Sequence, residues 1–270
     1  LLAPVDLFWN GGIGTYIKAE TESDADVGDR ANDPIRVNGN QLRVKVIGEG
    51  GNLGVTQPGR IEAAEAGVRI NTDAVDNSAG VETSDHEVNL KILVDRLVDA
   101  GEISKDERAA LIEEQVEEVA QQVLRSNIDQ NILLQAERLG TRPTNSAATR
   151  FIKFLSNNAG LDRDVEFLPT NDELAERRDN KERLTSPELS VLTAYSKLWL
   201  TQALIDENFG QDRWLEPVLQ EYFPSAVREK YGKHFWSHPL RREIIATKVA
   251  NEVIDTAGIV FVFRVVEETG

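Results

Sequence analysis

Three short segments near the start of the chain place glycine and asparagine directly after an apolar, strand-like run: residues 9–14, 48–54 and 71–80. Glycine lets backbone amides approach a ligand closely, and asparagine supplies both a donor and an acceptor. In an open parallel sheet, the loops that leave the carboxyl ends of the strands surround the ligand site. Turn formation explains any one of these segments alone. Their occurrence at successive strand ends favours a ligand crevice.

The order of elements in the first part of the chain predicts a parallel α/β unit. We expect a buried strand at residues 5–9, a strand of alternating polarity at 42–47, a helix at 60–67 and a third strand at 68–71. A strand–helix–strand order with glycine-rich tips is typical of parallel strands joined by a crossover. We interpret residues 19–40, which are rich in Asp, Asn and Gly, as a solvated loop.

The pattern becomes helical at Ser84 and stays helical. Ser84 and Glu87 have the spacing of a capping box before apolar residues that share one helical face, so we expect a helix to begin there. Similar start signals occur at Ser104, Thr170 and Ser186. The predicted fold class is therefore α/β plus all-α, a parallel sheet followed by a multi-helix domain. We place the division between residues 1–100 and residues 101–270.

Composition excludes several classes of protein. The formal charge of −16 leaves no basic patch for nucleic acid or for an anionic membrane surface. The chain has no Cys, hence no disulfide and no thiolate metal site, and we expect no metal site elsewhere, because the acidic run 113–118 is typical of a solvated helix face. The longest apolar run, 257–263, is far shorter than the roughly 20 residues that span a bilayer. The chain starts at Leu1 with no signal-peptide pattern, so we expect a piece of a cytoplasmic protein.

Two of the glycine and asparagine segments have a recognisable order. Residues 46–56 contain Gly-Glu-Gly-Gly-Asn-Leu-Gly, and residues 77–84 are Asn-Ser-Ala-Gly-Val-Glu-Thr-Ser. They resemble the Glu-Gly-Ala-Asn segment and the Asn-Ala-Gly-Gly-Val-Thr-Val-Ser segment of glutamate dehydrogenases. The resemblance is to the large NAD-specific enzymes of bacteria in particular. It extends to further segments over essentially the whole chain: residues 9–16, 26–32, 84–89, 166–169, 184–189, 222–224 and 238–247.

The resemblance implies a function, a cofactor and a set of site residues. The reaction would be oxidative deamination of L-glutamate to 2-oxoglutarate and ammonium, with hydride transfer to NAD on a partial Rossmann-like sheet. Cofactor-binding positions that match the family are Gly11 and Gly12 in the cleft, Gly50, Gly51 and Asn52 at the nicotinamide ribose, and Asn77 at the carboxamide. Ser84 matches the residue that contacts the side-chain carboxylate of glutamate. Ala79, Asp85 and His86 depart from the pattern of the shorter enzymes, which puts the contacts around residues 85 and 86 in doubt.

Two parts of a complete enzyme are missing from the sequence. A first βα turn of the Gly-x-Gly-x-x-Gly type does not occur in these 270 residues, and we expect the family's catalytic Lys and Asp to come from a domain that they do not include. We therefore assign no catalytic residue and expect the isolated chain to be inactive. The expected partners are upstream domains of the same polypeptide and further copies in a homo-oligomer.

Two alternatives remain open. One is a related amino-acid dehydrogenase for a branched or aromatic substrate, which the polar Ser84 disfavours. The other is a non-catalytic helical interaction module, favoured if the helical part exposes a large apolar patch. The aromatic residues to inspect, which we expect in the core, are Tyr222, Phe223, Tyr231, Phe235 and Trp236. We interpret His86 as structural rather than as an acid or base, and His238 as a helix-entry residue.

Overall fold

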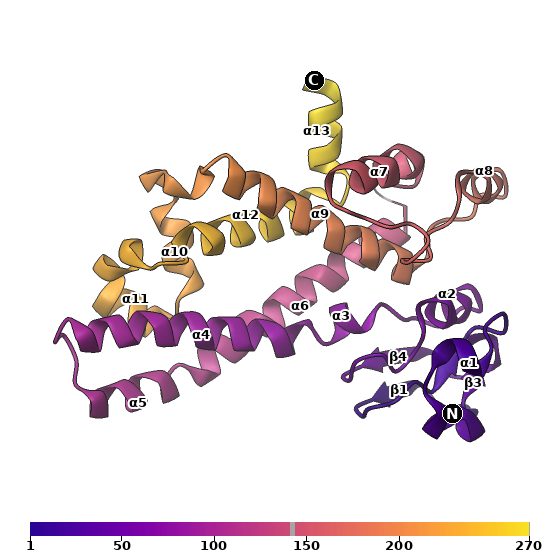
Figure 1. The fold of residues 1–270 in the computed structure, drawn as a ribbon, viewed down its shortest axis with the longest axis horizontal. Coiled ribbons are helices and arrows are strands. Elements are labelled where there is room, and N and C mark those ends of the chain that lie inside the picture. Colours follow the sequence, from indigo (N-terminus) through magenta and orange to yellow (C-terminus); the bar gives the residue numbers. More distant parts are fainter. Residues whose placement is uncertain (141–143, 270) are drawn as a thin grey trace. The chain divides into compact units, whose positions relative to one another are not determined.

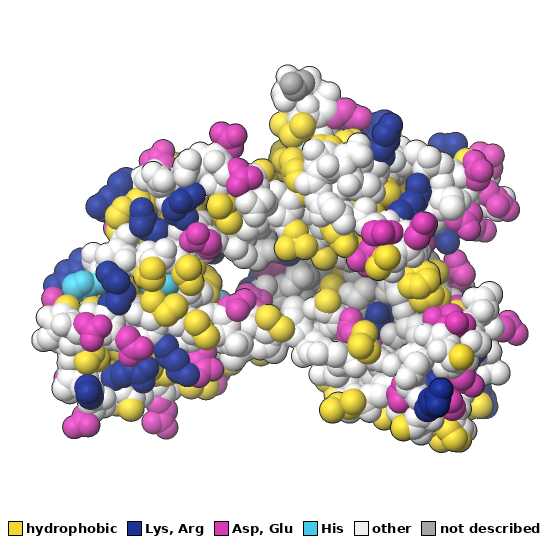
Figure 2. Space-filling model, in the orientation of Figure 1, with side chains coloured by type: hydrophobic (Ala, Val, Ile, Leu, Met, Phe, Trp, Pro, Cys, Tyr) yellow, Lys and Arg dark blue, Asp and Glu magenta, His cyan; other side chains and the backbone are white. Residues whose placement is uncertain are grey.

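The computed structural model describes residues 1–140 and 144–269, with the backbone alone described for 144 and 145. The chain divides into two compact units. Unit 1 comprises Leu1–Ser78, Gln130–Ser196 and Ala257–Gly270, and unit 2 comprises Ala79–Asp129 and Lys197–Thr256. Acidic and basic side chains lie beside one another on the face drawn in Figure 2.

Unit 1 contains two of the three expected strands, shortened and displaced toward the C-terminus, and a second pair of short strands that was not expected. Strand β1 (Leu7–Asn10) runs parallel to β4 (Val46–Glu49), and β2 (Ile17–Lys18) runs parallel to β3 (Val37–Asn38) (Figure 1). The third expected strand is a single parallel bridge between Val46 and Arg69. It is this short because the next helix, α3 (Asp73–Asp76), begins soon after it, with Thr72 at its N-cap position. The α/β character is therefore confirmed, but as two two-stranded sheets.

Helix α2 (Gln57–Glu65) follows β4 and packs against β2. The Thr56 hydroxyl accepts a hydrogen bond from the N–H of Gly59, which fixes the start of the helix three residues before the predicted one. Gly67 adopts φ +96° after the helix, as a stop signal requires. The buried apolar cluster around these elements is Ile17, Val44, Ile47, Val55, Ala63, Val68 and Ile70.

The prediction that the first strand is buried is wrong. Leu7 is 56% exposed and Trp9 is 60% exposed. The cause is that β1 pairs with β4 alone among the described strands.

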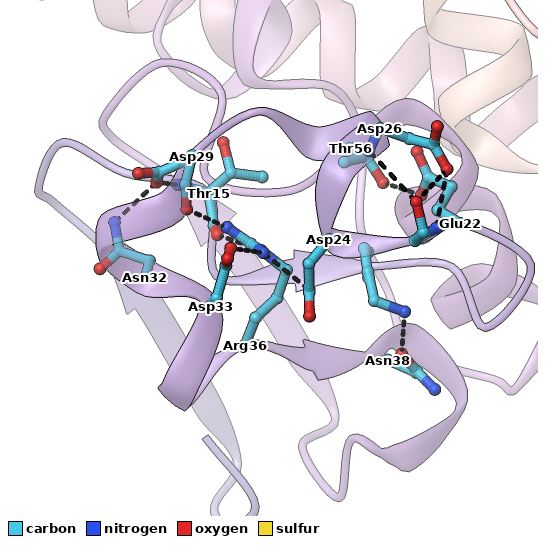
Figure 3. A network of polar contacts seen from close by, with 12 residues as sticks. Thr15, Glu22, Asp24, Asp26, Asp29, Asn32, Asp33, Arg36, Asn38 and Thr56 are labelled. Atoms are coloured by element: carbon cyan, nitrogen blue, oxygen red, sulfur yellow. Dashed lines mark hydrogen bonds and ion pairs between the residues drawn. The ribbon is translucent and has the colours of Figure 1, made fainter.

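The interpretation of residues 19–40 as a solvated loop is also wrong. This segment holds α1 (Asp24–Val27), the 3-10 helix η1 (Arg30–Ile35), β3 and η2 (Gly39–Gln41). Its charges pair with one another around Arg36, whose guanidinium is buried and donates to Asp24 at 2.7 Å and to Asp33 at 2.6 Å (Figure 3). Several of the Asp and Asn residues that indicated a loop cap short helices or accept hydrogen bonds from this guanidinium.

Beyond α3 the described residues form helices and connecting turns. In chain order these are α4 (Ser78–Asp99), α5 (Lys105–Glu113), α6 (Val116–Arg138), α7 (Thr144–Asn158), α8 (Asn171–Asp179), α9 (Ser186–Asp206), η3 (Phe209–Gln211), η4 (Arg213–Leu215), α10 (Glu216–Tyr222), α11 (Ser225–Tyr231), η5 (Gly232–Ser237), α12 (Arg241–Ala257) and α13 (Phe261–Thr269) (Figure 1). The predicted capping boxes at Ser104 and Thr170 are confirmed. None of the helices in the described ranges is both long enough and apolar enough to cross a bilayer.

The predicted helix start at Ser84 is wrong. Helix α4 begins at Ser78, so Ser84 lies inside the helix and on its exposed side. The Thr83 hydroxyl donates to the carbonyl of Ala79 at 2.6 Å, one turn earlier. This hydroxyl therefore has a hydrogen-bond partner inside the helix and does not interrupt it.

Helix α4 supplies one side of the core of unit 2. Its buried apolar residues are Leu90, Leu93, Val94 and Leu97, and they pack with residues of α10, α11, η5 and α12. Phe223, Tyr231 and Phe235 are buried in this cluster, and Tyr222 and Trp236 pack against it. The expected core position of these aromatic residues is confirmed.

Candidate functional site

The two glycine-rich loops of unit 1 meet because β1 and β4 are parallel and in register. Asn10 lies opposite Glu49, so both strands end at the same edge of the sheet. The carbonyl of Asn10 accepts hydrogen bonds from the N–H groups of Gly50 at 2.8 Å and Gly51 at 3.0 Å. Residues 11–12 and 50–52, predicted as one site from the sequence, therefore lie side by side.

Glycine is required at position 51 by a close backbone approach. A Cβ at Gly51 would lie 2.6 Å from the carbonyl oxygen of Gly12, which is closer than any side chain tolerates. At Gly12 itself, a Cβ would meet nothing within 4 Å. Packing within the chain therefore accounts for glycine at position 51. Gly12, in contrast, is exposed and has open space in front of it.

Asn52 and Asn77 come together from different segments. The side-chain amide of Asn77 donates to Oδ1 of Asn52 at 3.1 Å. Asn77 is held in this place by the end of α3, where its N–H donates to the carbonyl of Asp73 at 2.8 Å. The pair places amide donors and acceptors beside the loop of Gly50 and Gly51.

A buried ion pair lies at the base of this loop. Glu49 is 0% exposed and Arg60 is 4% exposed, and the guanidinium donates to both carboxylate oxygens at 2.7 and 2.9 Å. Burial raises the pKa of the Glu49 carboxyl, and the hydrogen bonds from Arg60 oppose that rise. The same guanidinium lies 3.3 Å from Asp73. Sequence reasoning missed this pair, although an acidic residue at the end of an apolar strand was a signal that it needs a buried partner.

Asp73 and Asp76 connect α3 to the end of β4. Asp76 accepts a hydrogen bond from the N–H of Glu49 at 3.0 Å, and Asp73 accepts one from the N–H of Leu53 at 2.8 Å. Burial raises the pKa of Asp76, against the hydrogen bond that Asn71 donates to it. The carboxylates of α3 thus hold the backbone of the loop that contains Gly50, Gly51 and Asn52.

Comparison with known proteins gives the family. The family described as bacterial NAD-glutamate dehydrogenase, catalytic domain, matches residues 1–137, about half of the chain, and the family described as glutamate dehydrogenase, C-terminal, matches residues 181–270. The chain belongs to the bacterial NAD-glutamate dehydrogenase family. The resemblance on which the sequence interpretation was built is confirmed.

Three relatives of the chain carry the same description, NAD-specific glutamate dehydrogenase. They come from Mycobacterium tuberculosis (53% identical), Halomonas elongata (46%) and Pseudomonas aeruginosa (45%), each over all 270 residues. The chain spans 17% of the length of each of these relatives.

Ser84, the remaining site residue predicted from the sequence, belongs to unit 2. It is an exposed residue within α4. Ser84 does not cap α4, so the capping role expected for its side chain is wrong. Its role toward glutamate stays a prediction.

The histidines of unit 2 have structural surroundings. His86 is buried and stacks on Tyr222, with ring centroids 4.2 Å apart, and burial lowers its pKa to about 4. His238 is buried; its Nδ1 accepts from the N–H of Leu240, so the proton is on Nε2, which donates to the carbonyl of Asn89 at 3.1 Å. Both interpretations made from the sequence agree with these contacts. Within the described ranges, no group of three His, Cys, Asp or Glu residues could hold a metal ion.

Proposed function

We propose that this chain forms the nicotinamide side of the cofactor site in an NAD-dependent glutamate dehydrogenase. The reaction is oxidative deamination of L-glutamate to 2-oxoglutarate and ammonium. The observation that supports the proposal most strongly is the hydrogen bond between Asn77 and Asn52 beside two glycine loops, because two side-chain amides next to approachable backbone suit a carboxamide ligand.

The residues present fit NAD in their chemistry. Gly11 and Gly12 are exposed at the end of β1, and the open space in front of Gly12 suits close approach of a cofactor to the backbone. Asn77 binds the nicotinamide carboxamide, and Gly50, Gly51 and Asn52 contact its ribose. Bound NAD supplies the hydride acceptor. Ser84 donates a hydrogen bond to the side-chain carboxylate of glutamate, which selects this substrate over apolar amino acids.

The domain assignment follows the same reasoning. Residues 1–100 are the C-terminal part of a Rossmann-like NAD-binding domain, and residues 101–270 are a helical C-terminal domain. The exposed apolar side chains of Leu7 and Trp9 on a two-stranded parallel sheet support further strands from elsewhere in the polypeptide. Upstream domains of that polypeptide supply the catalytic Lys and Asp. The full-length protein is a cytoplasmic homo-oligomer.

The test is made in the full-length protein that contains this chain, by following glutamate-dependent formation of NADH. Loss of a hydrogen bond to a ligand typically costs about 1 kcal/mol, so Asn77→Ala and Asn52→Ala should each raise KM for NAD about tenfold. Asn158→Ala is the matched control, because its amide bonds only the carbonyl of Phe154 within α7. An unchanged KM for NAD in both site variants would contradict the proposal.

A further inference from the structure

The residue after Asn52 has a strained backbone. Leu53 adopts φ 60°, the left-handed region that L-residues with a branched side chain rarely occupy. Its side chain is 68% exposed, so packing of the side chain does not explain the conformation. Such strain persists only where the surroundings impose it, and it is often found at functional sites.

Two side chains hold the backbone of Leu53 from opposite ends. Asp73 Oδ2 accepts from the N–H of Leu53 at 2.8 Å, and the hydroxyl of Thr15 donates to the carbonyl of Leu53 at 2.7 Å. Both polar groups of the strained residue therefore have a dedicated partner. The next carbonyl, of Gly54, accepts from the N–H of Tyr16 at 2.9 Å, so the chain leaves the loop in a fixed direction.

Each of these two partners is itself held in place. The other oxygen of Asp73 accepts from the N–H of Ala74 at 2.9 Å and faces Arg60 at 3.3 Å, and Arg60 is fixed by the buried Glu49. The support of Thr15 comes from the polar network in Figure 3. Its N–H donates to Asp29 at 2.8 Å, and its carbonyl accepts from the Nε of Arg36 at 2.9 Å.

Leu53 lies between two residues, Asn52 and Gly54, whose contacts require the backbone to change direction sharply. Before it, Asn52 meets the amide of Asn77; after it, Gly54 packs so closely on Asn10 that a Cβ at Gly54 would lie 1.4 Å from Nδ2 of Asn10. A left-handed residue makes the sharp change of direction that joins these two contacts. If Leu53 relaxed to an extended conformation, Asn52 would leave Asn77.

We propose that Asp73 and Thr15 are positioning residues for cofactor binding, which hold Leu53 in the left-handed conformation and thereby orient Asn52 toward the nicotinamide ribose. The inference rests on the proposed function of Asn52. It adds residues that touch neither cofactor nor substrate, and that act only through the backbone of the loop.

The experiment is a double-mutant cycle in the full-length protein. Asp73→Ala and Thr15→Val each remove one bond to Leu53 and should raise KM for NAD about tenfold, with KM for glutamate unchanged. Thr15→Ser keeps the hydroxyl and should behave as wild type. Leu53→Gly accepts the left-handed conformation without strain, so Asp73→Ala should raise KM for NAD only about twofold to threefold in the Leu53→Gly background.

Asp162→Ala is the matched control, because this carboxylate also accepts hydrogen bonds from backbone N–H groups, those of Asp164 and Val165, and belongs to neither the loop of residues 50–54 nor the network in Figure 3. It should leave KM for NAD unchanged. If Asp73→Ala does not fold, the cycle of Thr15→Val with Leu53→Gly gives the same coupling. Equal effects of Asp73→Ala or Thr15→Val with and without Leu53→Gly would overturn the inference. The proposed function fails separately: in that case Asn52→Ala itself leaves KM for NAD unchanged.

Discussion

The side-chain amide of Asn77 donates a hydrogen bond to Oδ1 of Asn52 across 25 residues of sequence. This bond does not use Oδ1 of Asn77 or Nδ2 of Asn52, and a carboxamide or a ribose hydroxyl can pair with both. Because Asn52 follows β4 and Asn77 follows α3, the contact joins two segments at the end of the sheet where β1 and β4 stop.

Alanine variants of Gly12 and Gly51 should distinguish an effect on cofactor binding from an effect on packing. Gly51→Ala places a methyl 2.6 Å from the carbonyl of Gly12 and should lower stability by about 1–3 kcal/mol. Gly12→Ala meets nothing within 4 Å, so the melting temperature should stay near that of wild type while KM for NAD rises. Thermal unfolding and steady-state kinetics of both variants provide the measurement. A Gly12→Ala variant with unchanged kinetics would show that no cofactor approaches this residue.

Ser84→Ala is a clean test of substrate recognition because Ser84 caps nothing. It is exposed within α4, and Ala is the better helix former, so the fold should not weaken. KM for glutamate should rise about tenfold through loss of a hydrogen bond to a carboxylate. The control is Ser104→Ala, which removes a real capping box and should cost about 1 kcal/mol of stability with no effect on KM. Equal KM values for Ser84→Ala and wild type would remove the assigned role.

The buried Glu49–Arg60 pair should behave as a coupled unit. Arg60→Met leaves the carboxylate of Glu49 buried without its partner, which typically costs about 3–5 kcal/mol. Glu49→Leu added to Arg60→Met removes the uncompensated charge and should recover a large part of that loss. Urea unfolding of the single and double variants measures the recovery. A double variant less stable than Arg60→Met would contradict the importance of the unpaired carboxylate.

His86 should make unit 2 sensitive to acid. Burial, assisted by the positive charge of Lys248, lowers its pKa from 6.5 to about 4. The unfolded chain therefore takes up a proton between these pH values that the folded chain does not, and stability falls as the pH decreases from 6.5 to 4. The shift corresponds to about 3 kcal/mol at most.

The variant that isolates this effect is His86→Phe, which retains stacking on Tyr222 and has no titratable group. Urea unfolding at both ends of the pH range should show a smaller loss for the variant than for wild type. Parallel curves for the two proteins would assign the acid sensitivity to other groups, such as the nearby Glu82.

Local signals predicted much of the fold. The capping boxes at Ser104 and Thr170 were correct because a side chain and a backbone N–H three residues apart decide such a start by themselves. Ser84 has the same spacing to Glu87, yet α4 begins at Ser78, since a capping pattern cannot show that the helix already exists upstream. The burial of β1 was predicted wrongly for a related reason, because the apolar sequence does not say which strands cover it.

The candidate site also contains residues that a local sequence pattern indicates and residues that only tertiary contacts reveal. Gly50, Gly51, Asn52 and Asn77 could be proposed from the sequence because the short segments that contain them resemble segments of the family. The groups that hold the loop could not be selected, because Arg60, Asp73 and Thr15 reach it through tertiary contacts rather than through a local pattern. Residues 19–40 resembled a solvated loop for the same reason: composition shows the charges of Asp24, Asp33 and Arg36 but not their pairing.

The most direct test of the proposed cofactor site is a structure of the full-length protein with NAD bound. We expect the nicotinamide carboxamide at hydrogen-bond distance, roughly 2.7–3.2 Å, from the side chain of Asn77, with the adjoining ribose at Asn52 and the backbone of Gly50 and Gly51. A nicotinamide bound away from Asn77 and from the loop of residues 50–52 would contradict it.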